Sequence, residues 1–124
     1  MSVLRLLALI FPACTTLALG AHAQDANAGV KVFQTYCGIC HTVQPDRNLV
    51  GPSLFGVVNR PSGHIPGFHY SEANRKSGLT WDVATLDRYL TAPRQVVPGT
   101  LMTFPGVKDA KQRADLIAYL ATLH

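Results

Sequence analysis

The stretch Cys37-Gly38-Ile39-Cys40-His41 decides the fold. Two thiols three positions apart, with a histidine directly after the second, form the attachment motif of a c-type haem. Each cysteine can form a thioether to one vinyl group of the haem, and the histidine can coordinate the iron from the same segment of backbone. The motif therefore predicts one covalent haem c, held through Cys37 and Cys40 with His41 as an axial ligand of the iron.

Two other interpretations of the cysteine pair are open. A C-x-x-C pair can be a thioredoxin-like dithiol, but that needs a βαβ unit with the motif at the start of a helix, whereas the residues before Cys37 look helical. A zinc site needs a second pair of ligands, and no cysteine follows Cys40. The histidine at the fifth position of the motif favours haem.

The first 23 residues have the form of a secretory signal peptide. Arg5 ends a short positive start, residues 6–19 are almost wholly apolar, and Ala21-His22-Ala23 has the A-x-A form of a cleavage site. This apolar run is too short for a transmembrane helix, which needs about 20 residues, although an uncleaved anchor is an alternative. We expect cleavage after Ala23, export to a bacterial periplasm, and no stable membrane insertion afterwards.

Cleavage leaves residues 24–124, whose length predicts a single domain. A chain this short buries a modest core, so a haem would supply much of the apolar interior. The mature chain keeps ten of the 11 basic residues and all seven acidic ones, a formal net charge of +3, because Arg5 is lost. It contains no basic run, so nucleic acid is not expected as a partner.

Apolar spacing predicts an all-α domain with two long loops. No segment alternates as a strand, and residues 42–69 and 93–106 are rich in proline and glycine. A long structureless loop in a small domain needs a reason, and wrapping a flat cofactor is one. Helices are expected over 26–36 after the N-cap Asp25, over 71–77 with Ser71 as N-cap, over 82–91, and from Asp109 to Leu123 with Gln112 in the capping-box position.

The second axial position of the iron has one sulfur candidate. Met102 is the only methionine of the mature chain and lies in a proline-stiffened, non-helical loop. A His/Met ligand pair raises the reduction potential of a haem. Two alternatives are open: Met102 could fill a gap in the core, or a second histidine could be the ligand, from among His64, His69 and His124.

Several further blocks surround the haem motif in a recognisable order. They are Gly29 and Phe33 before the motif, then Gly51-Pro52, Tyr70-Ser71-Glu72-Ala73-Asn74, Gly78-Leu79-Thr80-Trp81, Tyr89-Leu90, Pro98-Gly99-Thr100, Met102 and residues 113–120. With them, the chain from Ala26 to Leu123 resembles the class I c-type cytochromes, the group of soluble cytochrome c and bacterial cytochrome c2. The resemblance implies the cytochrome c fold: all-α, with N- and C-terminal helices that cross at Gly29, Phe33, Leu116 and Tyr119, and short helices and loops wrapped around one covalent haem.

The resemblance also implies which residues surround the haem. The carbonyl of Pro52 would accept a hydrogen bond from the non-ligating nitrogen of His41, which orients the ring and increases its donor strength. Buried propionate charges need polar partners. Two polar groups would complete the site: Arg60, Tyr70 and Trp81 at the haem propionates, and Asn74, Tyr89 and Thr100 beside Met102.

The chain departs from the family pattern at three positions. Asn59 takes the place of a glycine before Arg60, which is tolerable if this asparagine has a positive φ. Leu101 and Gln95 replace lysines of the mitochondrial members, so that the lysine ring around the exposed haem edge is thinned to Arg94 and scattered charges. We therefore expect a docking surface that is less sensitive to salt.

The function that the resemblance implies is that of a one-electron carrier and not of an enzyme, because both axial positions of the iron would be filled by the protein. It would be a monomer that shuttles electrons between transient redox partners, with membrane oxidoreductase complexes expected as donor and acceptor. Two other functions are open. In one, Met102 dissociates and the iron binds peroxide, nitric oxide or carbon monoxide; in the other, the chain is the haem subunit of a larger dehydrogenase or oxidase complex.

Overall fold

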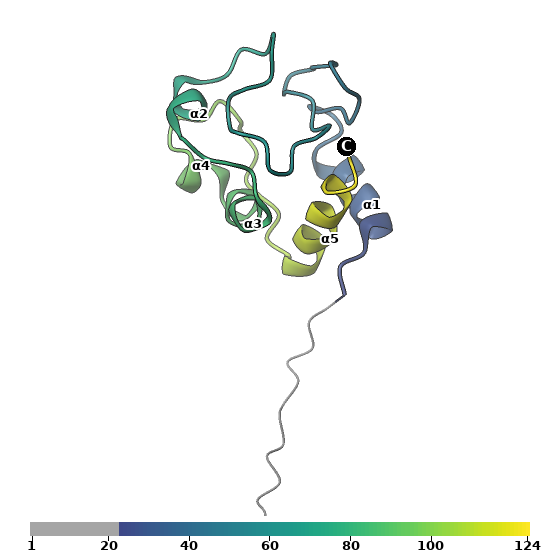
Figure 1. The fold of residues 1–124 in the computed structure, drawn as a ribbon. Helices are drawn as coiled ribbons and strands as arrows, with labels where there is room; N and C mark the ends of the chain where they lie inside the picture. Colours follow the sequence, from purple (N-terminus) through teal and green to yellow (C-terminus); the bar gives the residue numbers. More distant parts are fainter. Residues whose placement is uncertain (1–22) are drawn as a thin grey trace, which may run out of the picture.

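The computed structural model of the chain describes residues 23–124 (Figure 1). The predicted signal peptide lies outside this part, apart from Ala23 itself. The described residues form an all-α structure whose only β-type pairing is an isolated bridge between Pro61 and Thr80. None of their helices combines the length and the apolar character that crossing a bilayer requires. The helices are α1 (Ala26–Tyr36), α2 (Glu72–Lys76), α3 (Val83–Thr91), α4 (Pro93–Val96) and α5 (Ala110–Leu120).

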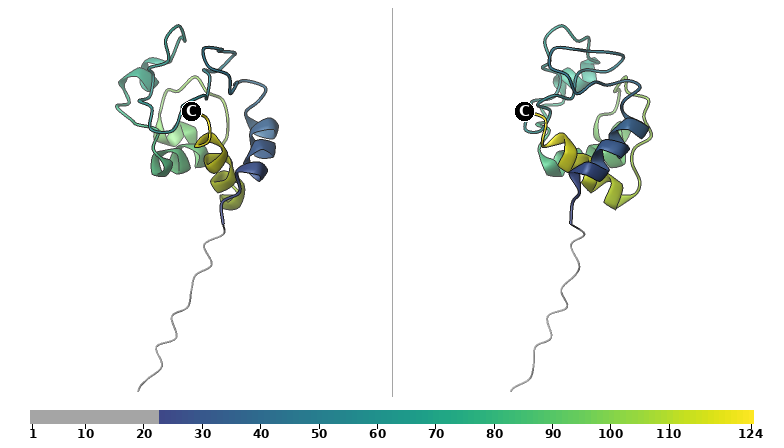
Figure 2. Two further views of the ribbon diagram at one scale, coloured as in Figure 1. Left: turned by 45° about the vertical axis from the view of Figure 1, so that its right-hand side comes forward. Right: turned by 90° about the vertical axis from the view of Figure 1, so that its right-hand side faces the viewer.

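The first and last helices cross each other, as predicted, and the two views of Figure 2 show them side by side. A Cβ on Gly29 would lie 2.7 Å from the Cβ of Tyr119, closer than two carbon atoms can approach. The rings of Phe33 and Tyr119 meet edge to face with centroids 5.8 Å apart. Gly29 therefore permits the close crossing, which outweighs the cost of about 1 kcal/mol for a glycine within a helix.

Side-chain caps begin the helices where the sequence places them. Asp25 accepts hydrogen bonds from the backbone N–H groups of Asn27 and Ala28 at the start of α1. Ser71 caps α2 by accepting from the N–H of Asn74. These caps satisfy donors that would otherwise have no partner in the first turn of a helix.

The structure corrects the prediction for α5 in two respects. The helix ends at Leu120 and not at Leu123, because the backbone tightens into a turn in which the N–H of Thr122 bonds the carbonyl of Tyr119. Asp109 does cap the helix by accepting from the backbone of Gln112. The amide oxygen of Gln112, however, accepts from the Tyr36 hydroxyl at 3.4 Å, so a hydrogen bond across to α1 takes the place of the expected capping box.

The structure also corrects the prediction that residues 93–106 are loop throughout. The first four form α4, and Pro93 occupies its N-terminal position. Proline is compatible with the first turn of a helix, where its missing N–H would have no partner in any case. Only residues 97–106 are loop.

Residues 42–69 form no helix, as predicted, and wrap over the helical layer (Figure 1). Backbone hydrogen bonds tie this loop to the segment before α3, from Ser62 N–H to the Leu79 carbonyl and from Asn59 N–H to the Trp81 carbonyl. Asn59 has a φ of +65°, the conformation that the replacement of glycine requires. The buried core between the helices and this loop includes Val32, Phe33, Val57, Leu86, Leu90, Val97, Val107, Leu116, Ile117 and Leu120.

Candidate haem site

One cavity of about 490 Å³ lies between the helices and the long loop. Its wall contains mainly apolar side chains from widely separated segments of the chain. All eleven predicted site residues line it, so the fold brings together what the sequence had separated. They are Cys37, Cys40, His41, Pro52, Arg60, Tyr70, Asn74, Trp81, Tyr89, Thr100 and Met102.

The donor groups on the wall of this cavity fit a covalent haem c. Cys37 and Cys40 are both free thiols and follow directly on α1. Burial, with a smaller contribution from Cys40, raises the pKa of the Cys37 thiol to about 11. Within residues 23–124 no group of three or more His, Cys, Asp and Glu side chains is placed to hold a bare metal ion. The zinc alternative therefore has no ligand set there.

The ring of His41 is held in one orientation by its second nitrogen. Nδ1 lies 2.7 Å from the carbonyl oxygen of Pro52, as the resemblance predicts. A carbonyl can only accept, so Nδ1 carries the proton and Nε2 keeps its lone pair for a ligand. Burial is the main cause that lowers the pKa of His41, which also favours the neutral ring.

Gly51 is a site residue that the sequence analysis noted without a role. A Cβ at this position would lie 2.6 Å from Nδ1 of His41 and 2.7 Å from its Nε2. The imidazole therefore lies flat against a backbone that has no side chain. The signal was present in the sequence as a glycine directly before Pro52, but only the folded loop shows which ring it faces.

Met102 lies on the cavity wall, and two of the polar residues predicted beside it, Tyr89 and Thr100, contact it. The hydroxyl of Tyr89 lies 3.9 Å from the Met102 sulfur, and the Met102 N–H bonds the Thr100 hydroxyl at 3.2 Å. Burial raises the pKa of Tyr89, and hydrogen bonds with the side chains of Thr100 and Asn74 oppose that rise. Tyr89 thus stays a neutral phenol whose O–H can donate to the thioether sulfur.

The three residues predicted for the propionates lie together, although backbone groups already occupy some of their polar atoms. Arg60 donates to the carbonyls of Phe55 at 2.8 Å and Ser53 at 3.1 Å. Burial lowers the pKa of Arg60 and raises that of Tyr70, whose hydroxyl accepts from the N–H of Ile65 at 3.3 Å. Their role toward propionates stays a prediction.

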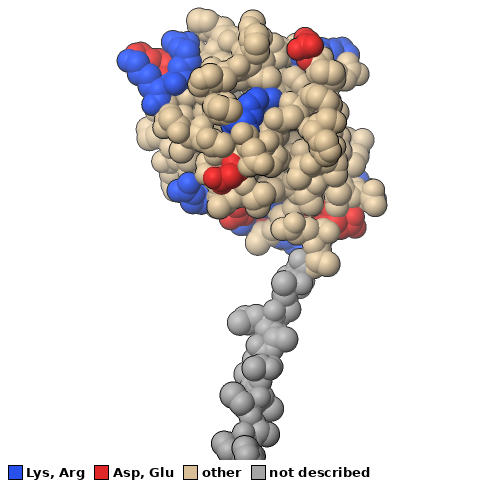
Figure 3. Space-filling view, in the orientation of Figure 1, with Lys and Arg blue, Asp and Glu red and all other residues tan. Residues whose placement is uncertain are grey.

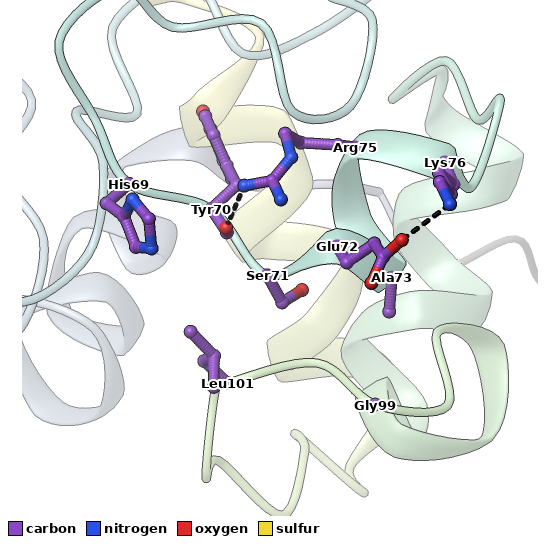
Figure 4. A pocket seen from close by; sticks show the side chains of 9 residues that line it. All are labelled: His69, Tyr70, Ser71, Glu72, Ala73, Arg75, Lys76, Gly99 and Leu101. Atoms are coloured by element: carbon purple, nitrogen blue, oxygen red, sulfur yellow. Dashed lines mark hydrogen bonds and ion pairs between the residues drawn. The ribbon is translucent and has the colours of Figure 1, made fainter.

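The alternative histidines differ in their positions. Nδ1 of His64 lies 2.6 Å from the Ser62 carbonyl, and His64 and His124 are exposed and do not line the cavity. His69 does line the cavity, at a mouth that it shares with an adjoining surface groove (Figure 4). His69 is thus the histidine that a bis-histidine arrangement would use.

The mouth of the cavity has an apolar rim that the sequence analysis identified only at Leu101. Ile39 is 85% exposed, Val50 80% and Leu101 68%, and all three line the cavity. Residue type does not distinguish exposed apolar side chains from buried ones, so Ile39 and Val50 could not be predicted from the sequence. Figure 3 shows acidic and basic side chains interspersed over one face of the molecule, with no patch of a single sign.

Comparison with known proteins agrees with this fold and this site. Residues 26–124 match the sequence model of the family described as Cytochrome c. The chain is 52% identical over 99 residues to cytochrome c2 of Rhodopila globiformis, an alignment that covers 80% of this chain and 93% of that protein. It is 53% identical over 100 residues to cytochrome c2 of Rhodoblastus acidophilus, covering 80% and 92%. The solved structure of cytochrome cH from Methylobacterium extorquens is similar with a TM-score of 0.75 at 48% identity, covering 79% of this chain and 98% of that one.

The fold and the site define a class I c-type cytochrome, and the chain belongs to the cytochrome c family. It carries one covalent haem c, for which Cys37 and Cys40 are the attachment cysteines. It is an electron carrier and not an enzyme. The dithiol and zinc interpretations of the motif are thereby set aside.

Proposed function

We propose that the chain is an exported, periplasmic one-electron carrier in which His41 and Met102 are the axial ligands of the haem iron. The observation that carries this proposal is the shared cavity, whose wall presents the two thiols, the His41 imidazole and the Met102 thioether. When bound, the haem supplies an Fe(II)/Fe(III) couple. A thioether opposite an imidazole favours the reduced iron, which suits a carrier of high potential.

The chain's own residues prepare both ligand atoms. Pro52 holds His41 with Nε2 free, and the Tyr89 hydroxyl lies beside the Met102 sulfur. With both atoms in use, no position is left for a substrate on the iron. Arg60, Tyr70 and Trp81 line the same cavity and are the groups that we assign to the propionates.

Export and the monomeric state are part of the proposal. The leader-like residues 1–23 support export. The mature chain has no cysteine besides the two of the haem-attachment motif, so an oxidising compartment leaves no other thiol to pair with them. N-terminal sequencing of the protein purified from its source tests cleavage after Ala23. A chain that retains Met1 to Ala23 would contradict it and favour the membrane-anchor alternative.

The partners that we propose are redox proteins that dock transiently at the mouth of the cavity. Its rim consists of Ile39, Val50 and Leu101, and no Lys, Asp or Glu side chain lines the cavity. In the adjoining groove, Leu101 and His69 lie at one end and the ion pair of Glu72 and Lys76, 2.5 Å apart, lies at the other (Figure 4). The three exposed apolar side chains of the rim favour apolar contact over charge pairing at the mouth itself.

The axial ligation is tested with Met102→Ala. The oxidised wild-type protein should show the weak far-red absorption band of sulfur bound to iron(III), and the variant should lack it. The matched control is Leu101→Ala, which shortens the exposed neighbouring side chain and should keep the band. A band that survives in Met102→Ala would rule out Met102 as the ligand.

Two measurements separate the proposed carrier from the other functions. The reduced wild-type protein should resist carbon monoxide at neutral pH, and rapid binding would favour a ligand-binding haem protein. The native mass of protein purified from its source should be that of one chain with one haem. A larger stable assembly would favour the subunit alternative.

A further inference from the structure

Asn48 lies outside the haem cavity, yet it is connected to His41 through a single peptide unit. The carbonyl of the peptide that joins Pro52 to Ser53 accepts a hydrogen bond from His41, and the distance from Nδ1 to the carbonyl oxygen is 2.7 Å. The N–H of the same peptide donates to Oδ1 of Asn48 at 2.9 Å. No peptide bond in the described residues is cis. In a planar trans peptide the C=O and N–H point in opposite directions, so fixing one fixes the other.

The bonds on the N-terminal side of Pro52 leave the orientation of the Pro52–Ser53 peptide dependent on Asn48. Proline has no N–H, so the peptide before Pro52 offers no donor of its own. The next donor back along the chain is the N–H of Gly51, which bonds the Cys40 carbonyl at 2.8 Å. That bond holds the loop against the haem motif, but it does not set the rotation of the Pro52–Ser53 plane.

The side chain of Ser53 is also committed elsewhere. Its hydroxyl donates to the carbonyl of Gln44 at 2.6 Å and accepts from the N–H of Phe55 at 3.2 Å. Ser53 is only 1% exposed, so water cannot readily replace a partner of its backbone N–H. A buried N–H without an acceptor costs about 1–3 kcal/mol, and the peptide would rotate to avoid that cost.

We infer that Asn48 is a positioning residue for His41, acting through the Pro52–Ser53 peptide. This inference rests on the proposed function, in which His41 ligates the iron. Asn48 keeps the Pro52 carbonyl aimed at Nδ1, which fixes the ring and raises the basicity of the imidazole. A stronger donor stabilises Fe(III) relative to Fe(II), so Asn48 keeps the reduction potential lower than it would otherwise be.

The test compares wild-type holoprotein with Asn48→Ala. We expect the equilibrium constant for reduction to rise roughly threefold, which is about 28 mV at about 59 mV per tenfold for one electron. The hyperfine-shifted proton resonances of the His41 ring in the oxidised protein should move, while the far-red band of Met102 ligation stays. Loss of that band would point to the methionine side and overturn the inference. Should Asn48→Ala yield too little holoprotein, Asn48→Ser, whose hydroxyl is shorter than the amide, is measured in its place.

Two variants in the same loop serve as controls. Asn48→Asp keeps an acceptor oxygen, and its added negative charge can only lower the potential, so the rise should be absent. Gln44→Ala removes the exposed bond from Arg47 to the Gln44 side chain, 2.9 Å long, and should leave both readouts unchanged. A rise in Asn48→Asp equal to that in Asn48→Ala, or His41 resonances that do not move in Asn48→Ala, would refute the role of Asn48.

Discussion

The two loops that present the ligand atoms are held in different ways. The His41 loop, residues 40–54, is closed by backbone bonds from Gly51 to Cys40 at 2.8 Å and from Leu54 to Thr42 at 2.9 Å, in addition to the Asn48 and Pro52 contacts. The Met102 loop, residues 97–106, has only longer bonds at its ligand, from Thr100 N–H to Val97 at 3.1 Å and from Met102 N–H to Thr100 at 3.2 Å.

This difference indicates where the site is rigid and where it can give way. Around His41 the hydrogen bonds are short, and Gly51 and Ser53 are buried. At Met102 the sulfur accepts one long hydrogen bond, 3.9 Å from the Tyr89 hydroxyl, and the neighbouring Leu101 is exposed. We therefore expect substitutions on the His41 side to prevent assembly of the site, and substitutions on the Met102 side to loosen a site that still forms.

The largest effect is expected for Gly51→Ala. The new methyl group would enter the space of the His41 ring, so either the ring or the loop must move. Overpacking of this kind costs typically about 1–3 kcal/mol. Disturbing the partner that orients a metal ligand lowers metal affinity by about 10–100-fold, so the yield of holoprotein should fall by about tenfold or more. Haem content per chain after expression measures this.

Gly38→Ala is the matched control for Gly51→Ala. Gly38 lies inside the haem motif itself, but a Cβ there would meet its nearest neighbour, Cα of Gln34, at an ordinary 3.5 Å. Holoprotein should form at close to the wild-type yield. Equal amounts of holoprotein from the two alanine variants would show that the His41 loop can shift to accept the methyl group. The His41 loop would then not be the rigid side of the site, which contradicts the contrast between the two loops.

Tyr89→Phe should have an intermediate effect, confined to the Met102 side. It removes the hydroxyl that lies 3.9 Å from the Met102 sulfur. One hydrogen bond contributes about 0.5–1.5 kcal/mol, so added imidazole should displace Met102 from the oxidised protein roughly 2–10-fold more readily. Spectroscopic titration with imidazole measures this.

The control for Tyr89→Phe is Tyr36→Phe, whose hydroxyl bonds Gln112 on α5 and not the methionine. It should bind imidazole like the wild type. If Tyr89→Phe also binds imidazole like the wild type, the Met102 loop is held by something other than the phenol.

The same contrast explains which parts of the site the sequence could predict. Local patterns along the chain include the motif at Cys37 to His41 and the helix caps Asp25 and Ser71. The structure confirms the helices that the two caps predict. The roles that we assign to Gly51 and Asn48 depend on which ring and which peptide they face in space, and no spacing along the chain carries that information. The helix α4 was missed because proline and glycine indicate a loop even where Pro93 starts a helical turn.

A smaller effect is expected when charge is added to the uncharged rim. Leu101→Lys places a cation at the mouth of the cavity, close to where an electron must leave. With an anionic one-electron reagent such as ferricyanide, the rate should rise a few-fold at low salt and fall more steeply as salt is added, because screening acts within about 10 Å at 0.1 M. The second-order rate constant over a range of ionic strength measures this.

Val83→Lys is the control for Leu101→Lys. It adds the same charge at an exposed apolar position at the start of α3, away from the cavity wall. Its salt dependence should stay close to that of the wild type. If both lysine variants respond alike, net charge and not the rim governs docking, and the Met102 side has no special part in it.

The smallest effect is expected for acid, which should act on both loops at once. Asp115 accepts from Lys111 Nζ at 2.6 Å and from the N–H of Asp25 at 2.8 Å, and these contacts lower the pKa of its carboxyl, Lys111 contributing most. This links the start of α1, which leads into the haem motif, to α5, which follows the Met102 loop. The contribution of Asp115 to stability is complete above the ordinary carboxyl pKa of about 3.9 and is lost as pH falls through the lowered value.

Asp115→Asn should therefore be less stable than the wild type at neutral pH and should lose less stability than it on acidification. Denaturant unfolding between pH 7 and pH 3 measures this, with Glu72→Gln as the control, because water screens the exposed pair of Glu72 and Lys76. In the wild type the Met102 band should be lost at a higher pH than the His41 resonances, because the helix pair supports both loops but the Met102 loop is the more weakly held of the two. If both signals disappear at the same pH, the two loops are held equally well, which contradicts the contrast between them.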